Sequence, residues 1–260
     1  MTTEADPIDG PPRRTATIRD AMQRLVELHF APYSLSPAGL EMITQYGVPR
    51  RHHKGMMLRR GAPGGQMDVH FIVWGCAAER TFDTPVLRFW GQGALLGDLD
   101  IVVGFRRESI GVRTIDFLSD TMTISCPIQR VRRIAEADTT VMAMIASIIA
   151  ERHLTSEKIY NNSRRPPTER VAGLLWHLVK STITLPRPEE FVLRGPTQAE
   201  LGEALMLSRA TVEKALAIMR KEGILANANA GLRSGHRGYI VKNAQRLEAL
   251  AWGYDDDFAY

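Results

Sequence analysis

The residues best suited to recognising another molecule are basic and lie near the carboxyl end of the chain. Arg209, Lys214 and Arg220 fall on one face of a predicted helix that Ser208 begins and Gly223 ends. The opposite face carries apolar residues at helical spacing, namely Val212, Ala215, Leu216 and Met219. A helix with an apolar back and a basic front fits the major groove of duplex DNA. An ordinary helical hairpin with a solvated, charged face is the alternative that this spacing also allows.

A shorter helix precedes this one and must support it. Thr197 can cap the shorter helix, and Glu200 three residues later completes a capping box. Its apolar stripe consists of Leu201, Ala204 and Leu205. A tight turn at residues 206–207 connects the two helices. Met206 stands where such a turn usually has glycine, so the turn must avoid the left-handed conformation or accept a small strain.

The residues after the second helix predict a wing. Two short strands are expected at 223–225 and 239–241, with a polar loop from 227 to 238 between them. The loop holds Arg233, His236 and Arg237 among glycines, which suits contact with backbone phosphates. Residues 196–246 include eight basic and four acidic residues, and this excess of +4 equals the net charge of the whole chain. The positive charge is therefore concentrated where DNA contact is predicted.

One long helix is predicted upstream, from Thr139 to Asn162, and Arg165-Pro166-Pro167 ends it as a hinge. Its residues alternate in steps of four and three, which is the spacing of a coiled-coil seam. The seam consists of Val141, Ile145, Ile148, Arg152, Thr155 and Ile159. Such a seam predicts a homodimer that presents two recognition helices about 34 Å apart to a near-palindromic site. The alternative is that this stripe packs on its own domain.

The region from 50 to 126 consists of short apolar segments separated by glycines. The predicted strands are 56–58, 69–74, 86–90, 111–114 and 122–125. Many short strands with glycine turns indicate a β-sandwich or roll. Before this region, helices are predicted near 18–29 and from Ser36-Pro37 to Tyr46. These two helices either pack on this strand-rich region or form a surface for a partner. The chain as a whole is predicted to be α+β.

Composition and cysteine spacing exclude several classes of protein. The 260 residues, 44% hydrophobic and 24% charged, allow two ordinary globular domains. No apolar run approaches the ~20 residues that span a bilayer, and no signal core is found, so we predict a cytoplasmic protein without membrane contact. Cys76 and Cys126 are far apart and predict buried thiols without a metal site. No nucleophile–base pair is found, and His52-His53 is expected on a surface loop, so no catalytic residue is predicted.

The helix-turn-helix resembles that of the Crp/Fnr family of bacterial transcription regulators, which includes the cyclic-AMP receptor protein. The resemblance rests on Thr197-Gln198, Glu200-Leu201-Gly202, Leu207-Ser208-Arg209 and Thr211-Val212, and it covers about residues 50–245. It implies a cyclic-nucleotide-binding-like β-roll (jelly roll), a long dimerisation helix and a C-terminal winged helix-turn-helix. The implied domains are an N-terminal helical extension at 1–45, the β-roll at 46–137, the dimerisation helix at 138–164, the winged helix-turn-helix at 165–246 and a tail at 247–260.

The resemblance also implies which residues contact DNA. Arg209 and Lys214 match family residues that reach base edges, and an arginine suits guanine O6 and N7. Ala210 stands where the family has an acidic residue, so readout of cytosine is lost. The operator should therefore differ from those of family members that have the acidic residue. Hydroxyls and wing arginines are implied to hold phosphates. The predicted DNA-binding residues are Thr197, Gln198, Ser208, Arg209, Ala210, Thr211, Glu213, Lys214, Arg233 and Arg237.

The stretch from Gly97-Asp98-Leu99 to Arg113-Thr114 resembles the phosphate-binding cassette of cyclic-nucleotide domains. Asp98 matches the residue that contacts the ribose, and Ser109 matches the hydroxyl that bonds the cyclic phosphate. The arginine expected before that serine is Glu108, whose charge would cost several powers of ten in nucleotide affinity. The neighbouring Arg107 points to the opposite face unless a bulge shifts the register. The alternative is that residues 106–108 form a solvated hairpin tip.

The segment 154–159, Leu-Thr-Ser-Glu-Lys-Ile, is similar to the family segment whose threonine and serine reach the adenine ring. The effector residues implied by the resemblance are Gly97, Asp98, Leu99, Arg107, Ser109, Thr155 and Ser156. A cyclic nucleotide, another small effector and a purely structural remnant are all left open. The expected partners are double-stranded DNA, a second copy of the chain and RNA polymerase. The alternative function is a cyclic-nucleotide-binding module whose basic domain docks on an acidic protein.

Overall fold

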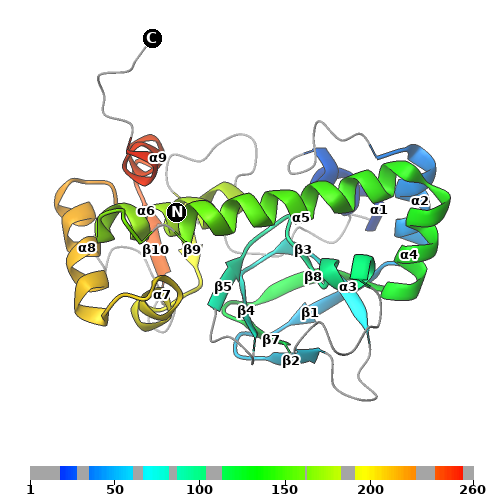
Figure 1. Cartoon of the computed structure of the whole chain (residues 1–260), viewed down its shortest axis with the longest axis horizontal. Helices are drawn as coiled ribbons and strands as arrows, with labels where there is room; N and C mark the ends of the chain where they lie inside the picture. The colour runs from blue at the N-terminus through cyan, green and yellow to red at the C-terminus, as the bar shows by residue number, and fades with distance from the viewer. Residues whose placement is uncertain are drawn as a thin grey trace, which may run out of the picture.

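The computed structural model describes residues 18–27, 35–60, 67–81, 87–103, 113–161, 163–182, 191–226 and 238–253. A β-roll, one long helix and a C-terminal helical domain follow each other along the chain (Figure 1). Several predictions fall outside the described residues. They concern residues 1–17, the cassette residues Arg107, Glu108 and Ser109, the wing residues Arg233 and Arg237, and the tail after 253.

Two four-stranded antiparallel sheets form the roll. The first sheet has the order β1 (Val48–His52), β8 (Thr121–Pro127), β3 (Asp68–Trp74) and β6 (Leu95–Leu96). The second has the order β2 (Met57–Arg60), β7 (Arg113–Phe117), β4 (Ala77–Thr81) and β5 (Leu87–Trp90). This arrangement confirms the predicted jelly roll. The sequence prediction missed β1, β4 and β6.

Strand β3 is buried on both faces, because it lies between the second sheet and a layer of helices. Ile72 faces the other sheet and packs with Ala77, Trp90, Leu96, Ile115 and Phe117. Val69, Phe71 and Val73 face the opposite way, into a second core that the helices close. His52 is also buried, with its ring stacked 4.0 Å from the ring centroid of Phe117, so its expected place on a surface loop is wrong.

Helices α1 (Ile18–Leu25) and α2 (Pro37–Tyr46) pack on the first sheet of the roll. Met22, Leu25 and Ile43 are at most 1% exposed, and they share a core with residues of β3 and β8. The backbone N–H of Gly39 donates to the Ser36 hydroxyl at 2.8 Å, which caps α2 as the Ser-Pro start predicts. Of the two alternatives for the N-terminal helices, the structure therefore shows packing on the roll.

The long helix α5 (Thr139–Ile159) starts where it was predicted to start and ends three residues earlier. It follows α3 (Asp98–Val103) and α4 (Ile128–Ala137), and it runs from the end of the molecule near α2 and α4 to the C-terminal domain (Figure 1). Val141, Ile145, Ile148 and Ile159 of the expected seam are at most 4% exposed within a single chain. The seam assignment was therefore wrong, because these side chains fill the cores of their own protomer.

The C-terminal domain is a group of helices closed by a two-stranded sheet. Its elements are α6 (Pro167–Thr182), β9 (Phe191–Arg194), α7 (Gln198–Leu205), α8 (Arg209–Lys221), β10 (Gly238–Val241) and α9 (Ala244–Trp252). Helix α9 packs along α6 and buries Leu247 and Ala251. The boundary expected between 246 and 247 therefore falls inside a helix that belongs to this domain. None of the described helices is both long and apolar enough to cross a membrane.

The roll and the C-terminal domain share one continuous cluster of buried side chains. Ala78, Leu87 and Phe89 of the roll belong to the same cluster as Leu201 and Leu205 of α7. At the edge of this contact the Arg80 guanidinium makes a bidentate ion pair with Glu203 of α7, and its second bond is 3.0 Å long. The position of the helix-turn-helix relative to the roll is therefore set by direct packing as well as by α5.

Candidate nucleic-acid interface and sensor site

The first helix of the helix-turn-helix, α7, has the predicted capping box. The backbone N–H of Glu200 donates to Thr197 Oγ1 at 3.2 Å, and the backbone N–H of Thr197 donates to Glu200 Oε2 at 2.6 Å. Both Thr197 and the neighbouring Gln198 are half-buried at the helix start. The box fixes where α7 begins, and therefore where the turn into α8 must form.

The turn between the helices takes the strained option. Met206 has φ 52° and ψ 44°, the left-handed conformation, and its side chain is 83% exposed. A Cβ on Gly202 would lie 2.7 Å from the carbonyl oxygen of Leu207, so the turn passes against a position that only glycine can occupy. The close approach at Gly202 keeps the turn tight although Met206 would favour another backbone conformation.

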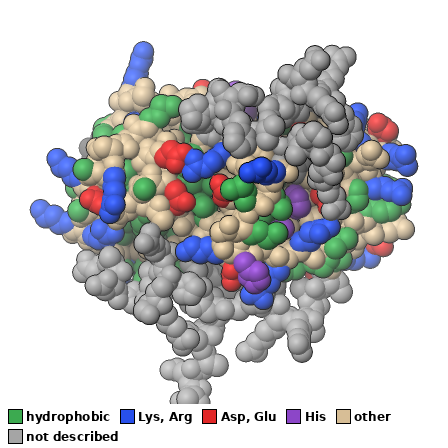
Figure 2. All heavy atoms as spheres, turned by 90° about the horizontal axis from the view of Figure 1, so that it is seen from below, with side chains coloured by type: hydrophobic (Ala, Val, Ile, Leu, Met, Phe, Trp, Pro, Cys, Tyr) green, Lys and Arg blue, Asp and Glu red, His purple; other side chains and the backbone are tan. Residues whose placement is uncertain are grey.

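Helix α8 separates an apolar face from a charged one, as predicted. The Ser208 hydroxyl accepts the backbone N–H of Thr211 at 3.1 Å and caps the helix. The buried face consists of Val212, Ala215, Leu216 and Met219, none more than 1% exposed. The exposed face carries Arg209, Ala210, Glu213, Lys214, Ala217 and Lys221. Figure 2 shows Lys and Arg side chains gathered at the left-hand end of the molecule, the end that α8 forms in Figure 1.

Two interactions organise the exposed face of α8. Arg209 Nε donates to Glu213 Oε1 at 2.9 Å one turn later, and the Arg209 side chain is still 72% exposed. At the other end, Arg246 Nη1 donates to the carbonyl oxygen of Glu222 at 2.8 Å. The arginine thereby satisfies one carbonyl that the helix end leaves without a partner. An i, i+4 ion pair on the surface is worth only about 0.2–0.5 kcal/mol, so Arg209 can exchange Glu213 for another acceptor.

The strands of the wing pair differently from the prediction. The expected strand 239–241 is part of β10, which pairs along its length with β9 in front of the helix-turn-helix. Residue 225 of the other expected strand makes one bridge, to Val241. The sheet beside α8 therefore uses the segment before α7 as its second strand. Gly223, with φ 71°, ends α8 as predicted.

In the sensor region, the acidic residue of the expected cassette is already paired. Gly97 ends β6 with φ 88°, and Asp98 begins the short helix α3 at 1% exposure. Asp98 Oδ1 accepts the backbone N–H of Leu99 at 2.9 Å and a short hydrogen bond from Arg152 of α5. Asp98 Oδ2 makes no hydrogen bond within the described part of the chain. A ribose hydroxyl would therefore meet a carboxylate that Arg152 already neutralises.

Arg152 lies at the centre of a buried charge network that the sequence analysis missed. Its second guanidinium nitrogen donates to Glu79 Oε2 at 2.6 Å, and its first also donates to the Leu95 carbonyl at 3.2 Å. Glu79 in turn accepts from Arg113 and from Trp90 Nε1, both at 3.2 Å. The Arg152 guanidinium stacks over the Trp90 ring, 4.1 Å from its centroid. An arginine in a mostly apolar stripe was the signal that an acidic partner had to lie nearby.

The pKa directions follow from burial and from the two arginines. Burial raises the pKa of Asp98 and outweighs the attraction of Arg152. Burial also disfavours the Glu79 carboxylate, but Arg152 and Arg113 together outweigh it and lower the pKa of Glu79. The cluster therefore contains two guanidinium groups opposite two carboxylates, with Asp98 the easier of the two acids to protonate.

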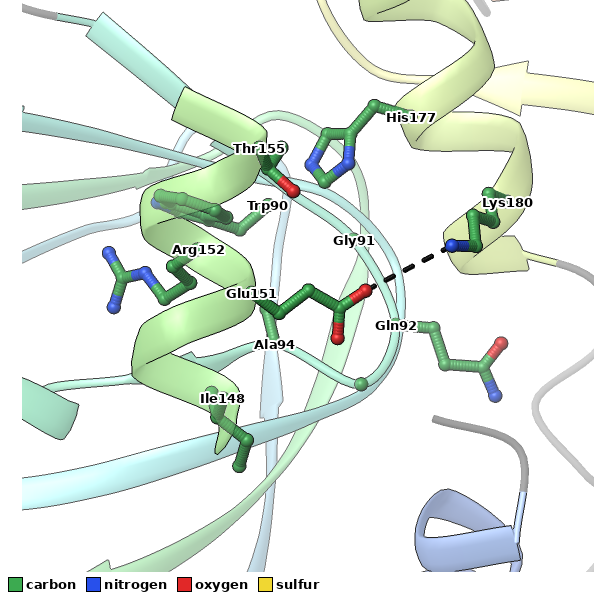
Figure 3. A pocket seen from close by; sticks show the side chains of 11 residues that line it. Trp90, Gly91, Gln92, Ala94, Ile148, Glu151, Arg152, Thr155, His177 and Lys180 are labelled. Atoms are coloured by element: carbon green, nitrogen blue, oxygen red, sulfur yellow. Dashed lines mark ion pairs between the residues drawn. The ribbon is translucent and has the colours of Figure 1, made fainter. Parts of the chain in front are cut away.

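Thr155 and Ser156, the other predicted effector residues, are half-buried on α5. Thr155 lines a pocket between α5, α6 and the turn after β5 (Figure 3). Gly97, Asp98 and Leu99 are not among the residues that line this pocket. The structure thus separates the predicted effector residues into a paired carboxylate on one side and an open pocket on the other.

The two cysteines are buried free thiols, as predicted. Burial raises the pKa of Cys76 and that of Cys126 to about 12, so both thiols stay protonated at neutral pH. Within the described ranges, no group of three or more histidine, cysteine or acidic side chains could hold a metal ion.

A helix-turn-helix with an exposed basic helix, joined to a β-roll through one long helix, defines a class of DNA-binding transcription regulators. Residues 169–250 match the family described as the Crp-like helix-turn-helix domain. The chain therefore carries a Crp-like domain in its C-terminal part, and the resemblance to Crp/Fnr regulators is confirmed. A search of curated proteins found no matching sequence.

Several solved structures share the fold over 78–80% of this chain. FixK2 from Bradyrhizobium japonicum is 19% identical over 78% of this chain and 96% of its own, with a TM-score of 0.55. A CRP/FNR-family regulator from Thermus thermophilus is 17% identical over 79% and 98%, with a TM-score of 0.54. The c-di-GMP-responsive global regulator CLP of Xanthomonas campestris is 16% identical over 80% and 100%, also with a TM-score of 0.54. These similarities establish the predicted fold.

Proposed function

We propose that this protein regulates transcription by binding DNA as a homodimer, with α8 of each protomer in a major groove. The observation that carries the proposal is the exposed face of α8. Arg209 is 72% exposed and Lys214 is exposed one turn further on, while the apolar face of the same helix is completely buried. Because the apolar face of α8 is fully packed, the basic face is held toward solvent in a fixed orientation, as direct readout of base edges requires.

The roles of the α8 residues follow from their positions. Arg209 and Lys214 are assigned to base edges, with Arg209 suited to guanine. Ser208 and Thr211 lie at the positively polarised start of the helix, where phosphate oxygens bind favourably. Ala210 adds no acceptor for cytosine. Thr197, Gln198 and Glu213 complete the proposed surface in the described region, and Arg233 and Arg237 stay predicted phosphate contacts of the wing.

The homodimer is proposed to form through a face of α5 next to the seam that the sequence suggested. Met142 is 39% exposed and Leu154 58% exposed, although both are apolar. Ala146 and Ala150 are exposed between them, so the four residues repeat in steps of four along one stripe. A second copy of α5 would bury this stripe and bring two α8 helices to half-sites about 34 Å apart. The operator would then be near-palindromic, and RNA polymerase is the partner we expect at the promoter.

Binding of cyclic nucleotides in the family's usual manner is not expected. Asp98 is paired with Arg152, and the cassette has Glu108 where a phosphate needs a cation. Cyclic AMP, cyclic GMP and cyclic di-GMP should therefore leave the melting temperature of the protein unchanged. A clear stabilisation by any of them would contradict this expectation.

The DNA-binding proposal is tested by fluorescence anisotropy on duplexes selected from a random pool. Arg209→Ala should lose about 1–3 kcal/mol of binding free energy and relax one base position. Arg133→Ala, an exposed arginine on α4 in the sensor half, is the matched control and should bind normally. An equal loss on every sequence would contradict the base contact. A shallow dependence of log Kd on log salt would favour the acidic-protein partner.

The dimer proposal is tested by sedimentation equilibrium. Leu154→Glu should convert the dimer to a monomer, because it places a charge in an apolar interface. Gln129→Glu, an exposed change on α4, is the control and should leave the mass unchanged. A dimer that survives Leu154→Glu would place the interface elsewhere.

A further inference from the structure

One pocket lies where the sensor, the long helix and the Crp-like domain meet; we call it the junction pocket. The turn from Trp90 to Ala94 forms one wall, and α5 forms the second with residues at one-turn spacing from Ile148 to Thr155. His177 and Lys180 of α6 form the third wall (Figure 3). The cavity volume is about 80 Å³, room for roughly six water molecules. The pocket therefore suits a small ligand rather than a nucleotide.

Two opposite charges face each other across the junction pocket. Figure 3 shows Glu151 of α5 and Lys180 of α6 pointing toward one another, with 4.0 Å between Glu151 Oε1 and Lys180 Nζ. This distance is too long for a hydrogen bond, and the side chains are 61% and 67% exposed. A surface pair of this kind contributes little to stability, so either group can take up a ligand charge at small cost.

The remaining walls add apolar surface and no further net charge. Trp90, Ala94 and Ile148 supply the apolar part. Burial lowers the pKa of His177 to about 4, so its ring is neutral at physiological pH. The charge of Arg152 is balanced by Glu79 and Asp98 on the other side of α5. A ligand would therefore meet one anion, one cation and an apolar wall.

We propose that the junction pocket binds an α-amino acid with a small apolar side chain. Its ammonium would pair with Glu151 and its carboxylate with Lys180, and its side chain would lie against Trp90 and Ile148. The two charges of an amino acid are joined through a single carbon atom, so they can lie beside the carboxylate and ammonium of the protein pair. A ligand with one charge would leave either Glu151 or Lys180 facing a like charge, which disfavours it.

Because the walls come from both domains, a bound amino acid would hold the roll, α5 and α6 in the arrangement seen here. This consequence rests on the proposed function: the occupied pocket should alter the DNA affinity of the dimer, since it biases the position of the Crp-like domain. A change of at least several-fold in Kd for DNA is expected.

The full chain is tested by thermal unfolding and isothermal titration with L-leucine, L-valine and L-alanine. At least one should raise the melting temperature by a few degrees at millimolar concentration. For leucine, the single-charge analogues 4-methylpentanoate and 3-methylbutylamine should not. Glu151→Gln and Lys180→Gln should each weaken binding about two- to five-fold, and Glu136→Gln on α4, an exposed change, should not.

Three results would overturn the proposal. They are the absence of stabilisation by any of the three amino acids, equal stabilisation by 4-methylpentanoate, and binding that both Glu151→Gln and Lys180→Gln leave intact. DNA binding without amino-acid binding would refute the pocket and leave the regulator standing. Amino-acid binding without DNA binding would refute the proposed DNA-binding function and leave the pocket proposal standing.

Discussion

Replacing Arg152 by methionine should be among the most damaging single changes in the contact between α5 and the roll. The side chain joins α5 to the roll through Asp98, Glu79 and the Leu95 carbonyl, and its guanidinium covers Trp90. Methionine keeps much of the apolar stem and removes only the charge and the donors. The variant therefore isolates the electrostatic part of the contact between the long helix and the roll.

The expected loss is about 3–5 kcal/mol of unfolding free energy, since one partner of a buried ion cluster disappears. Glu79 would keep Arg113 and Trp90 Nε1, both at 3.2 Å, so most of the cost should fall on Asp98. Asp98 would keep the N–H of Leu99 and no other hydrogen bond within the described residues. For a chain of this size the loss corresponds to a drop in melting temperature of roughly 10 °C.

The assay is urea unfolding of four proteins: wild type, Arg152→Met, the double variant with Asp98→Asn, and Arg130→Met as control. The double variant should regain at least about 1.5 kcal/mol, because it no longer buries an unpaired charge. The exposed control, whose guanidinium lies 5.0 Å from the Tyr46 ring centroid, should lose less than about 1 kcal/mol. A loss below about 1 kcal/mol for Arg152→Met, or no recovery in the double variant, would refute the reasoning.

The pH dependence of Arg152→Met gives an independent check. Burial already raises the pKa of Asp98 above its ordinary value in the native protein, and loss of Arg152 should raise it further. The folded variant would then bind a proton at a pH where the unfolded chain does not. Its stability should therefore rise relative to wild type as the pH falls from 7 to 5. A constant difference over this range would show that Asp98 does not carry the penalty.

Three further changes test other parts of the structure. Met206→Gly should stabilise the protein by about 0.5–1 kcal/mol in urea unfolding, because glycine takes the left-handed turn without Cβ strain. Arg80→Glu should lower the melting temperature, because the new carboxylate repels Glu203. The double variant Arg80→Glu with Glu203→Arg should recover part of the lost melting temperature. No recovery would mean that the ion pair is not formed. Stability should fall as the pH drops from 6.5 towards 4, since the unfolded chain protonates His177 and the folded chain, with its pKa at about 4, does not. His177→Gln should flatten this slope.

The helix-turn-helix was predictable because its signals are local. Thr197 and Glu200, like Ser208 and Thr211, are three residues apart, and their hydrogen bonds form whenever the helix forms. The apolar spacing of α8 fixed its buried face in the same way. The backbone conformation of Met206 could not be predicted, because the sequence allowed either an unstrained or a left-handed turn. The close approach of Leu207 to Gly202 decided it.

The strands of the roll were predicted only where they alternate or are strongly apolar. Strand β4, Ala77–Thr81, escaped because it carries Glu79 and Arg80, and β6 is only two residues long. The buried charge of Glu79 is stabilised by Arg152, which is 73 residues away in the chain. No local sequence pattern could therefore predict that these two residues pair.

The amino-acid sequence by itself determined several helices, among them α2, α5, α7 and α8, where α8 starts, and which of its sides is apolar, because periodicity and capping depend on neighbours within one turn. It did not predict α3, α4 or α9. Only the tertiary structure decided what the apolar stripe of α5 packs against, which strand pairs with β10, and that Arg152 neutralises Asp98. Each of these depends on surfaces brought together from distant parts of the chain. A periodic pattern shows that a face is buried, but the partner that buries it is fixed only when the whole chain has folded.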